Sequence, residues 1–471
     1  MNPDTKALKQ LRKKSLRWPT DQGFFIFKNF LLQNLPSSST VRLIRSLYNS
    51  PTDARGESKK FFHWCNKAYG AGKFLKSRRL LRTAIGLLGE VVPTAYSSLL
   101  DTAVKQTSRE PDRRSSYSNS ILHTTKEIRQ ETFDAYSWYQ LSRGLFSLGY
   151  FRAAWVAREN SLDLSITESL ASDPSVTALQ RGMEALFERR NYLEVEKFYT
   201  DVRNHGLFPD VRINLSLVQN YTNRLAVNPE SPSSEALKKL DSLIRDKYVV
   251  VIGPACPSGE YGEEIDKADT VIRLKFTDGQ KSSLSKFYGS RADILYFGGG
   301  QSMSAVRLLA EQGLFTNLFE EAKLILTNTS FSGQIRSVPV HVIQSAGKLY
   351  RTPSTSGLRT VMEVLKHKPQ KLTIYGFDFY STLTTYNQVL FEFYENSSWQ
   401  FGHPNDFITD GIYMKFARAR DFAEHDPVSN FCFAQNLYKA GLFEIEPYGK
   451  SILEITPYKY VERLEEMLGD W

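Results

Sequence analysis

The sequence predicts two domains of different class: an all-helical, repeat-like domain over residues 51–227 and a Rossmann-like α/β domain over residues 241–471. Three observations lead to this prediction. Apolar residues follow helical spacing before residue 228, whereas short β-branched runs alternate with helical patterns after residue 241. Between the two parts, the linker 228–240 begins with a segment rich in Asn, Pro and Ser, which favour turns. Strands that alternate with helices predict a parallel sheet with both faces covered.

The first 50 residues are expected to form a basic N-terminal arm. The net charge of the 471-residue chain is +9, and residues 1–80 carry 17 Lys and Arg side chains against four acidic ones. The apolar segment 24–35 is too short to cross a bilayer, and residues 1–19 lack the apolar core of a signal peptide. Such an arm predicts either peripheral contact with an anionic membrane surface or a solvated basic face. No nucleic-acid motif accompanies the charge, so nucleic acid is not an expected partner.

Helical patterns dominate residues 58–225. Three stretches, 64–84, 138–158 and 179–202, each place two helical patterns around a turn. In the second, Leu145, Gly149 and Ala153 resemble the tetratricopeptide pattern, although a non-repeating helical bundle is an open alternative. Arrays of this kind offer concave surfaces, so a protein partner is expected here. The polar segment Gln106–Thr125 is predicted to be an exposed loop.

Six β-branched runs predict the strands of the α/β domain: 248–252, 270–274, 294–297, 323–326, 338–343 and 371–375. The three cysteines, Cys65, Cys256 and Cys432, are far apart in sequence, which predicts free thiols in a reducing compartment.

A first block of polar residues follows the first two predicted strands. Gly253 opens a loop that reaches Ser258, at the sheet edge where open α/β sheets bind nucleotides. Arg273 and Lys275 close the second strand, where they are expected to meet a phosphate. The alternative is a surface-exposed basic pair.

A second block opens a helix. Thr355, Ser356 and Gly357 precede a helical pattern that leads to the strand 371–375. The free amides and positive dipole end of a helix start suit an anion or a carboxylate. Ordinary helix capping is the alternative explanation.

The two blocks, in this order and separation, resemble the large and small sialylmotifs of glycosyltransferase family 29. Thr355-Ser356-Gly357, together with Asp378-Phe379-Tyr380, is also similar to the bacterial sialyltransferases of family 42. The resemblance covers about residues 245–430 and implies a GT-A-variant sialyltransferase fold. It implies that the CMP-sugar donor binds to Gly253, Ser258, Arg273, Lys275, Thr355, Ser356, Gly357 and Asp378, with Tyr380 and Tyr386 on the leaving phosphate. It further implies that His425 is the catalytic base, and His403 is a candidate residue on the acceptor side.

The resemblance implies an inverting glycosyltransferase that moves a 2-keto sugar acid of the sialic acid type to a glycan or glycolipid hydroxyl. CMP leaves with a single phosphate, so neither a metal nor another cofactor is expected. The chain departs from the animal pattern at Pro254 and Lys275, where asparagines are usual, and at Asn430, where the HxxxxE motif has its carboxylate. The positions of the animal disulfide hold Val249 and Pro369. The absence of this disulfide, together with the absence of an expected membrane anchor, implies a bacterial, cytoplasmic enzyme of polysaccharide biosynthesis, with peripheral membrane contact as an option. The departures at Pro254 and Lys275 concern the identity of the sugar.

Two alternatives remain open. The first keeps the fold and replaces the donor by CMP-Kdo, another 2-keto sugar acid, for capsule or lipopolysaccharide synthesis. The second is a helical-repeat scaffold with an inactive transferase domain. A Rossmann-type dehydrogenase is disfavoured, because the loop 253–259 lacks the GxGxxG spacing.

Overall fold

The computed structural model describes residues 114–147, 150–189, 235–255, 257–274, 285–298, 322–328, 334–335, 338–343, 348–382 and 425–468. The basic arm and the predicted site residues Lys275, Tyr386 and His403 lie outside this set. The chain divides into two compact units. The first comprises Met1–Ser161, Lys415–Glu424 and Leu468–Trp471, and the second comprises Leu162–Met414 and His425–Met467.

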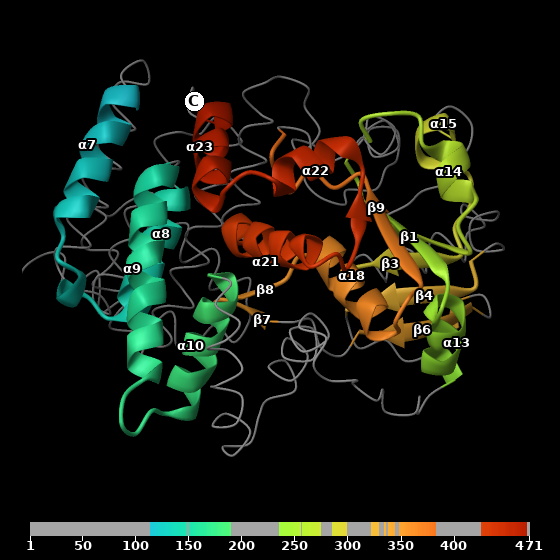
Figure 1. Ribbon diagram of the computed structural model, residues 1–471, viewed down its shortest axis with the longest axis horizontal. Coiled ribbons are helices and arrows are strands. Elements are labelled where there is room, and N and C mark those ends of the chain that lie inside the picture. Colours follow the sequence, from blue (N-terminus) through green and yellow to red (C-terminus); the bar gives the residue numbers. More distant parts are fainter. Residues whose placement is uncertain are drawn as a thin grey trace, which may run out of the picture. The chain divides into compact units, whose positions relative to one another are not determined.

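The described part of the first unit is helical. It contains α7 (Arg114–Glu127), the 3₁₀ helix η2 (Gln130–Thr132), α8 (Ala135–Ser147) and most of α9 (Phe151–Ser169) (Figure 1). The Ser161 hydroxyl donates to Ala135 O, so the start of α8 lies beside the middle of α9 and the two helices run antiparallel. The pattern over residues 138–158 predicted two helices joined by a turn, and the structure contains both helices, α8 and α9.

Helix α7 corrects one prediction. Residues 114–125 were expected in an exposed loop, but they are helical. Ser118, Ile121 and Thr125 are buried along one face of α7, and the Thr125 hydroxyl donates to Ile121 O at 2.7 Å. A helix that buries small hydroxyl-bearing side chains has little apolar periodicity, so its sequence has the composition of a loop.

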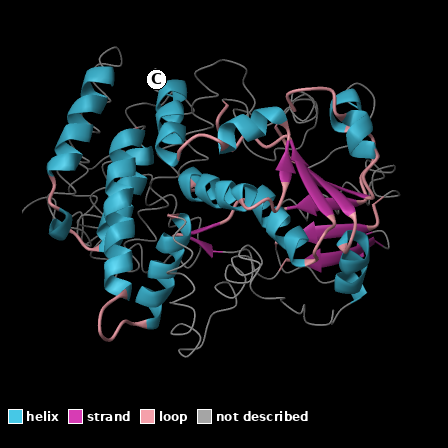
Figure 2. Ribbon diagram, in the orientation of Figure 1, coloured by secondary structure: helices cyan, strands magenta, loops and turns pink. Residues whose placement is uncertain are grey.

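The described residues of the second unit include a sheet, whose strands are drawn in magenta in Figure 2. Its eight strands have the order β10-β9-β1-β2-β3-β4-β6-β5. Six strands correspond to the predicted ones: β1 (Tyr248–Ile252), β2 (Thr270–Leu274), β3 (Ile294–Phe297), β4 (Leu324–Thr327), β6 (Val338–Val342) and β9 (Lys371–Tyr375). These six and β10 (Glu444–Ile445) are parallel, whereas β5 (Gln334–Ile335) is antiparallel at the edge. Every residue of β2, β3 and β4 is buried, as expected for a parallel sheet covered on both faces. The predicted parallel α/β sheet is confirmed.

Eight further helices, the end of α9 and one hairpin complete the described part of this unit. The helices are α10 (Val176–Glu188), α13 (Glu235–Ile244), α14 (Gly262–Asp266), α15 (Ser285–Tyr288), α18 (Ser356–Lys366), α21 (Pro427–Lys439), α22 (Pro447–Leu453) and α23 (Pro457–Leu468). The hairpin pairs β7 (Lys348–Leu349) with β8 (Thr352–Pro353). None of the helices in the described residues combines the length and the apolar character needed to cross a bilayer.

Helix α10 packs with the sheet-bearing unit. The Ser429 hydroxyl of α21 donates to Glu188 Oε2 at 3.0 Å, and Asn436 Nδ2 donates to Phe187 O at 2.8 Å. The rings of Phe187 and Phe433 lie 5.0 Å apart. The compact unit that contains the sheet includes α10 and begins at Leu162. The domain boundary expected at residues 228–240 stays a prediction.

A buried ionic network joins α18 to β6. Glu363 is buried, its carboxylate lies 3.2 Å from His341 Nε2, and it accepts a hydrogen bond from Lys366 Nζ at 2.5 Å. Burial alone would raise the pKa of Glu363, but the His341 contact and the Lys366 charge outweigh it and lower the pKa to about 2. The network holds the carboxyl-terminal half of α18 against the sheet.

Candidate functional site

The order of the strands defines one edge of the sheet as the candidate site. From β1 the chain proceeds through β2, β3, β4 and β6 on one side, and it then returns to place β9 and β10 on the other side of β1. The connections therefore diverge between β1 and β9. Open α/β sheets bind ligands in the crevice outside the carboxyl ends of the strands at such a topological switch point. Here these ends are Ile252–Gly253 and Tyr375–Gly376.

The loops that follow β1 and β9 touch each other through two glycines. Gly253 N–H donates to Tyr375 O at 2.7 Å, and Ala255 N–H donates to Gly376 O at 3.1 Å. A Cβ atom on Gly253 would lie 2.3 Å from Gly376 O. Gly376 itself has φ +66° and faces Ala255 O. Side chains are thus excluded at both positions by close backbone approach, and the predicted donor contact of Gly253 stays a prediction.

Glu446 binds both loops at this junction. Its buried carboxylate accepts hydrogen bonds from Gly376 N–H (2.6 Å), from Ser258 N–H (2.6 Å) and from the Ser258 hydroxyl (2.9 Å). Ser258, predicted as a donor-binding residue, is therefore engaged with Glu446. Sequence reasoning missed Glu446, for which the only local signal is its place before Pro447 at the start of α22.

The second predicted block opens α18 at the same edge. Thr355 occupies the N-cap position, but its side chain does not cap the helix. A Cβ atom on Gly357 would lie 2.6 Å from the Phe377 ring, and one on Gly298, after β3, would lie 2.9 Å from Ser356 Oγ. Ser354 Oγ is buried and has no hydrogen-bond partner among the described residues. The start of α18 therefore lies between the ends of β3 and β9.

Asn430 ties α18 to the turn that carries the predicted base. The Thr355 N–H donates to Asn430 Oδ1 at 2.7 Å, and Asn430 Nδ2 donates to Asp426 O at 2.8 Å. Asn430 is only 4% exposed. Asp426 caps α21, since its carboxylate accepts from Val428 N–H and Ser429 N–H. The position at which the sequence departs from the HxxxxE pattern is thus a structural bridge that sequence reasoning did not predict.

His425 and Tyr380 lie next to each other. Their ring centroids are 6.4 Å apart with an interplanar angle of 33°, and both side chains are half-buried. Tyr380 belongs to a tight turn in which Asp378 Oδ1 accepts from Tyr380 N–H at 3.1 Å and Asp378 Oδ2 accepts from the Thr382 hydroxyl. Asp378, predicted to bind the donor, therefore organises the turn that carries Tyr380.

Arg273, predicted as a donor-binding residue, is buried inside the sheet-bearing unit. It is 1% exposed, and its guanidinium donates to Arg291 O (2.6 Å) and Tyr288 O (2.7 Å). All residues of β2 are buried, so a long side chain on this strand extends between the layers rather than into solvent. The sequence identified the end of the strand but not the direction of this side chain.

Asp266, the last residue of α14, has a structural role. The Asp266 carboxylate accepts from Ser290 N–H (2.9 Å), the Ser290 hydroxyl (2.9 Å) and Arg291 N–H (3.1 Å). The Arg291 guanidinium donates back to Asp266 O at 2.8 Å. Two segments that the resemblance covers, 261–266 and 287–297, are therefore bonded to each other.

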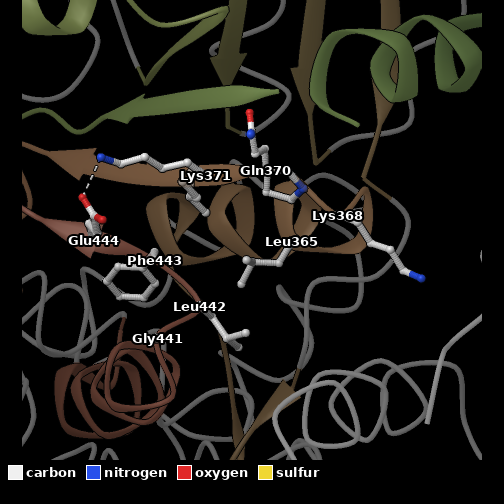
Figure 3. Close-up of a pocket in the computed structure, with 10 residues that line it drawn as sticks. Leu365, Lys368, Gln370, Lys371, Gly441, Leu442, Phe443 and Glu444 are labelled. Carbon is white, nitrogen blue, oxygen red and sulfur yellow. Dashed lines mark ion pairs between the residues drawn. The ribbon is translucent and has the colours of Figure 1, made fainter. Parts of the chain in front are cut away.

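One cavity of about 320 Å³ lies elsewhere on the sheet-bearing unit. Leu365, Lys368, Leu442 and Phe443 contribute to its lining, and Lys371 pairs with Glu444 at 2.9 Å beside it (Figure 3). Lys371 is the first residue of β9, so the cavity is at the amino end of this strand, opposite the switch-point edge. None of the predicted site residues lines it.

The switch-point edge thus gathers Gly253, Thr355, Ser356, Gly357, Tyr380 and His425, which come from distant parts of the sequence. An uncapped helix start suits an anion, and an imidazole beside a phenol suits proton transfer. Within the described residues, no group of three or more His, Cys, Asp or Glu side chains is arranged to hold a metal ion. Comparison of the sequence with protein-family models and with curated proteins finds no significant match.

Proposed function

We propose that the chain is an inverting glycosyltransferase that moves a 2-keto sugar acid of the sialic acid type from a CMP-activated donor to a glycan hydroxyl. One observation supports this more than any other. Gly253 and the start of α18, which belong to the two blocks that resemble the sialylmotifs, lie at the switch-point edge of a parallel sheet, and the rings of His425 and Tyr380 are neighbours. The uncapped start of α18 and the buried, unpartnered Ser354 hydroxyl among the described residues add support for an anionic ligand there.

In the proposed reaction, the bond between the anomeric carbon and the phosphate oxygen breaks, and CMP leaves with both electrons. The acceptor hydroxyl oxygen forms the new bond on the opposite face, so the anomeric configuration inverts. The proton of this hydroxyl goes to the His425 imidazole, which acts as general base. The Tyr380 hydroxyl donates a hydrogen bond to the departing phosphate, where negative charge develops. In this proposal Tyr386 and Lys275 assist on the phosphate side, and His403 lies near the acceptor.

The proposal extends to the rest of the chain. It assigns the α/β unit to the GT-A-variant sialyltransferase class and the helical residues to contact with a protein partner or with the acceptor. It also places the enzyme in the cytoplasm, with the basic arm against the inner face of the membrane.

Release of CMP tests the proposal directly. Purified full-length protein is incubated with CMP-sialic acid and, separately, with CMP-Kdo, each with and without an oligosaccharide acceptor. We expect CMP release from the sialic acid donor and a loss of about 10²- to 10⁴-fold in the His425→Asn variant. His123→Asn is the matched control, because His123 is an exposed residue of α7 in the other unit.

The two donors separate the alternatives. Preferential use of CMP-Kdo would keep the reaction type and replace the sugar. Absence of CMP release from both donors, or full activity of the His425→Asn variant, would contradict the proposal and favour the scaffold alternative.

A further inference from the structure

Tyr460 of α23 holds the turn that carries Tyr380. The Tyr460 side chain is completely buried, and its hydroxyl donates to Phe379 O. Phe379 immediately precedes Tyr380 in the chain. The hydroxyl therefore fixes the peptide group that joins these two residues.

The turn needs such an external hold because of its backbone conformation. Phe379 has φ +49° and Tyr380 has φ +63°. Two consecutive non-glycine residues in the left-handed region are unfavourable, and they persist only where surrounding contacts determine them. The Asp378 carboxylate supplies one contact from within the turn, and the Tyr460 hydroxyl supplies one from outside it.

The same tyrosine also contacts the helix that follows the predicted base. Its ring stacks on Phe431 of α21, with centroids 4.1 Å apart and an interplanar angle of 3°. Helix α21 begins directly after His425 and Asp426. Tyr460 thus contacts the turn that carries Tyr380 and the helix that follows His425.

A second contact from the same region holds the turn one residue later. The Tyr448 hydroxyl of α22 lies 3.3 Å from Ser381 Oγ and accepts a hydrogen bond from Arg463 Nη2 at 3.1 Å. Helices α22 and α23, which lie together at the carboxyl-terminal end of the unit (Figure 1), therefore support the turn at Phe379 and at Ser381.

We propose that Tyr460 is a positioning residue that sets Tyr380 beside His425. It does not belong to either sialylmotif-like block, and it acts through the Phe379 carbonyl. The proposal rests on the proposed function for its catalytic meaning, but the geometric part concerns only the pair of Tyr380 and His425.

The Tyr460→Phe variant of the full-length protein removes only the hydroxyl, because the phenyl ring keeps the stack on Phe431 and fills the same space. Tyr458→Phe is the matched control, since Tyr458 lies on the same helix, two residues earlier, and is 39% exposed. Two measurements do not depend on catalysis. The first is hydrogen exchange of the Tyr380 and Ser381 amides, and the second is the NMR signal of the His425 ring.

In the Tyr460→Phe variant we expect the two amides to exchange about tenfold faster, which is the equilibrium factor for the loss of one well-formed hydrogen bond. The His425 ring signal should move, because a neighbouring phenol ring changes its position, whereas the His341 and His367 signals stay in place. With a CMP-sugar donor, kcat should fall about tenfold with little change in KM. Tyr458→Phe should behave as the wild type in all three measurements.

The measurements test the positioning role of Tyr460 and the proposed function separately. Unchanged amide exchange and an unchanged His425 signal would overturn the positioning role. Faster exchange together with an unchanged kcat would show that Tyr460 is only a structural residue, and this result would also overturn the positioning role. If the wild-type protein turns over no CMP-sugar, the proposed function fails, while the exchange and NMR measurements still decide whether Tyr460 sets the pair.

Discussion

Asn430 offers a quantitative test of how the candidate site is assembled. The Asn430→Ala variant removes the acceptor of the Thr355 N–H and one of the donors to Asp426 O. Asp426 O still accepts a hydrogen bond from the backbone N–H of Asn430 in the variant. Losing the side-chain hydrogen bond to Asp426 O therefore costs about 1 kcal/mol, as for one ordinary hydrogen bond. The Thr355 N–H loses its Asn430 acceptor and has no second acceptor among the described residues. Because Thr355 is half-buried, leaving this donor unsatisfied costs about 1–2 kcal/mol. The free energy of unfolding should therefore fall by about 2–3 kcal/mol.

Urea denaturation of the full-length protein measures this change, and hydrogen exchange locates it. The Thr355 amide should exchange faster in the variant, because its acceptor is gone. Asn436→Ala is the matched control: Asn436 is also a buried asparagine of α21, but it donates to Phe187 O on α10. Asn436→Ala should destabilise the protein without changing exchange at Thr355. A loss below about 0.5 kcal/mol for Asn430→Ala, or equal exchange at Thr355 in both variants, would refute the bridge.

Two further predictions concern other parts of the sheet-bearing unit. The Glu363 pKa is lowered from 4.5 to about 2, so this carboxylate contributes stability that is complete above about pH 4.5 and is lost as the pH falls towards 2. The unfolding free energies of wild type and Glu363→Gln should therefore differ by about 3 kcal/mol at pH 6 and converge towards pH 2, as measured by denaturation at several pH values; a constant difference would contradict the network. Gly376→Ala should lower the melting temperature much more than Gly441→Ala. Both residues have positive φ, but a Cβ on Gly376 would lie 2.6 Å from Ala255 O whereas one on Gly441 meets open space, so equal losses would argue against the close approach of the two loops.

Local sequence patterns predicted most of the sheet. The six predicted strands are present with ends that agree to within one residue, because β-branched runs bounded by turns and helical patterns have few other ways to bury their side chains. Strands β5 and β10 were missed, since two residues are too few to show a period. Helix α7 was mistaken for a loop, since its buried face includes Ser118 and Thr125.

The sequence by itself determined which segments form the candidate site, because glycines after strands and hydroxyls before a helix are local signals of a sheet edge and a helix start. Tertiary structure alone decided what those residues touch. Ser258 meets Glu446 across 188 positions of the chain, and Thr355 meets Asn430 across 75. It also decided that β9 pairs with β1, which creates the switch point, and that Arg273 lies inside the unit. Local patterns carry periodicity and turn preference, whereas partners far apart in sequence become neighbours only when the strand order brings their loops to one edge.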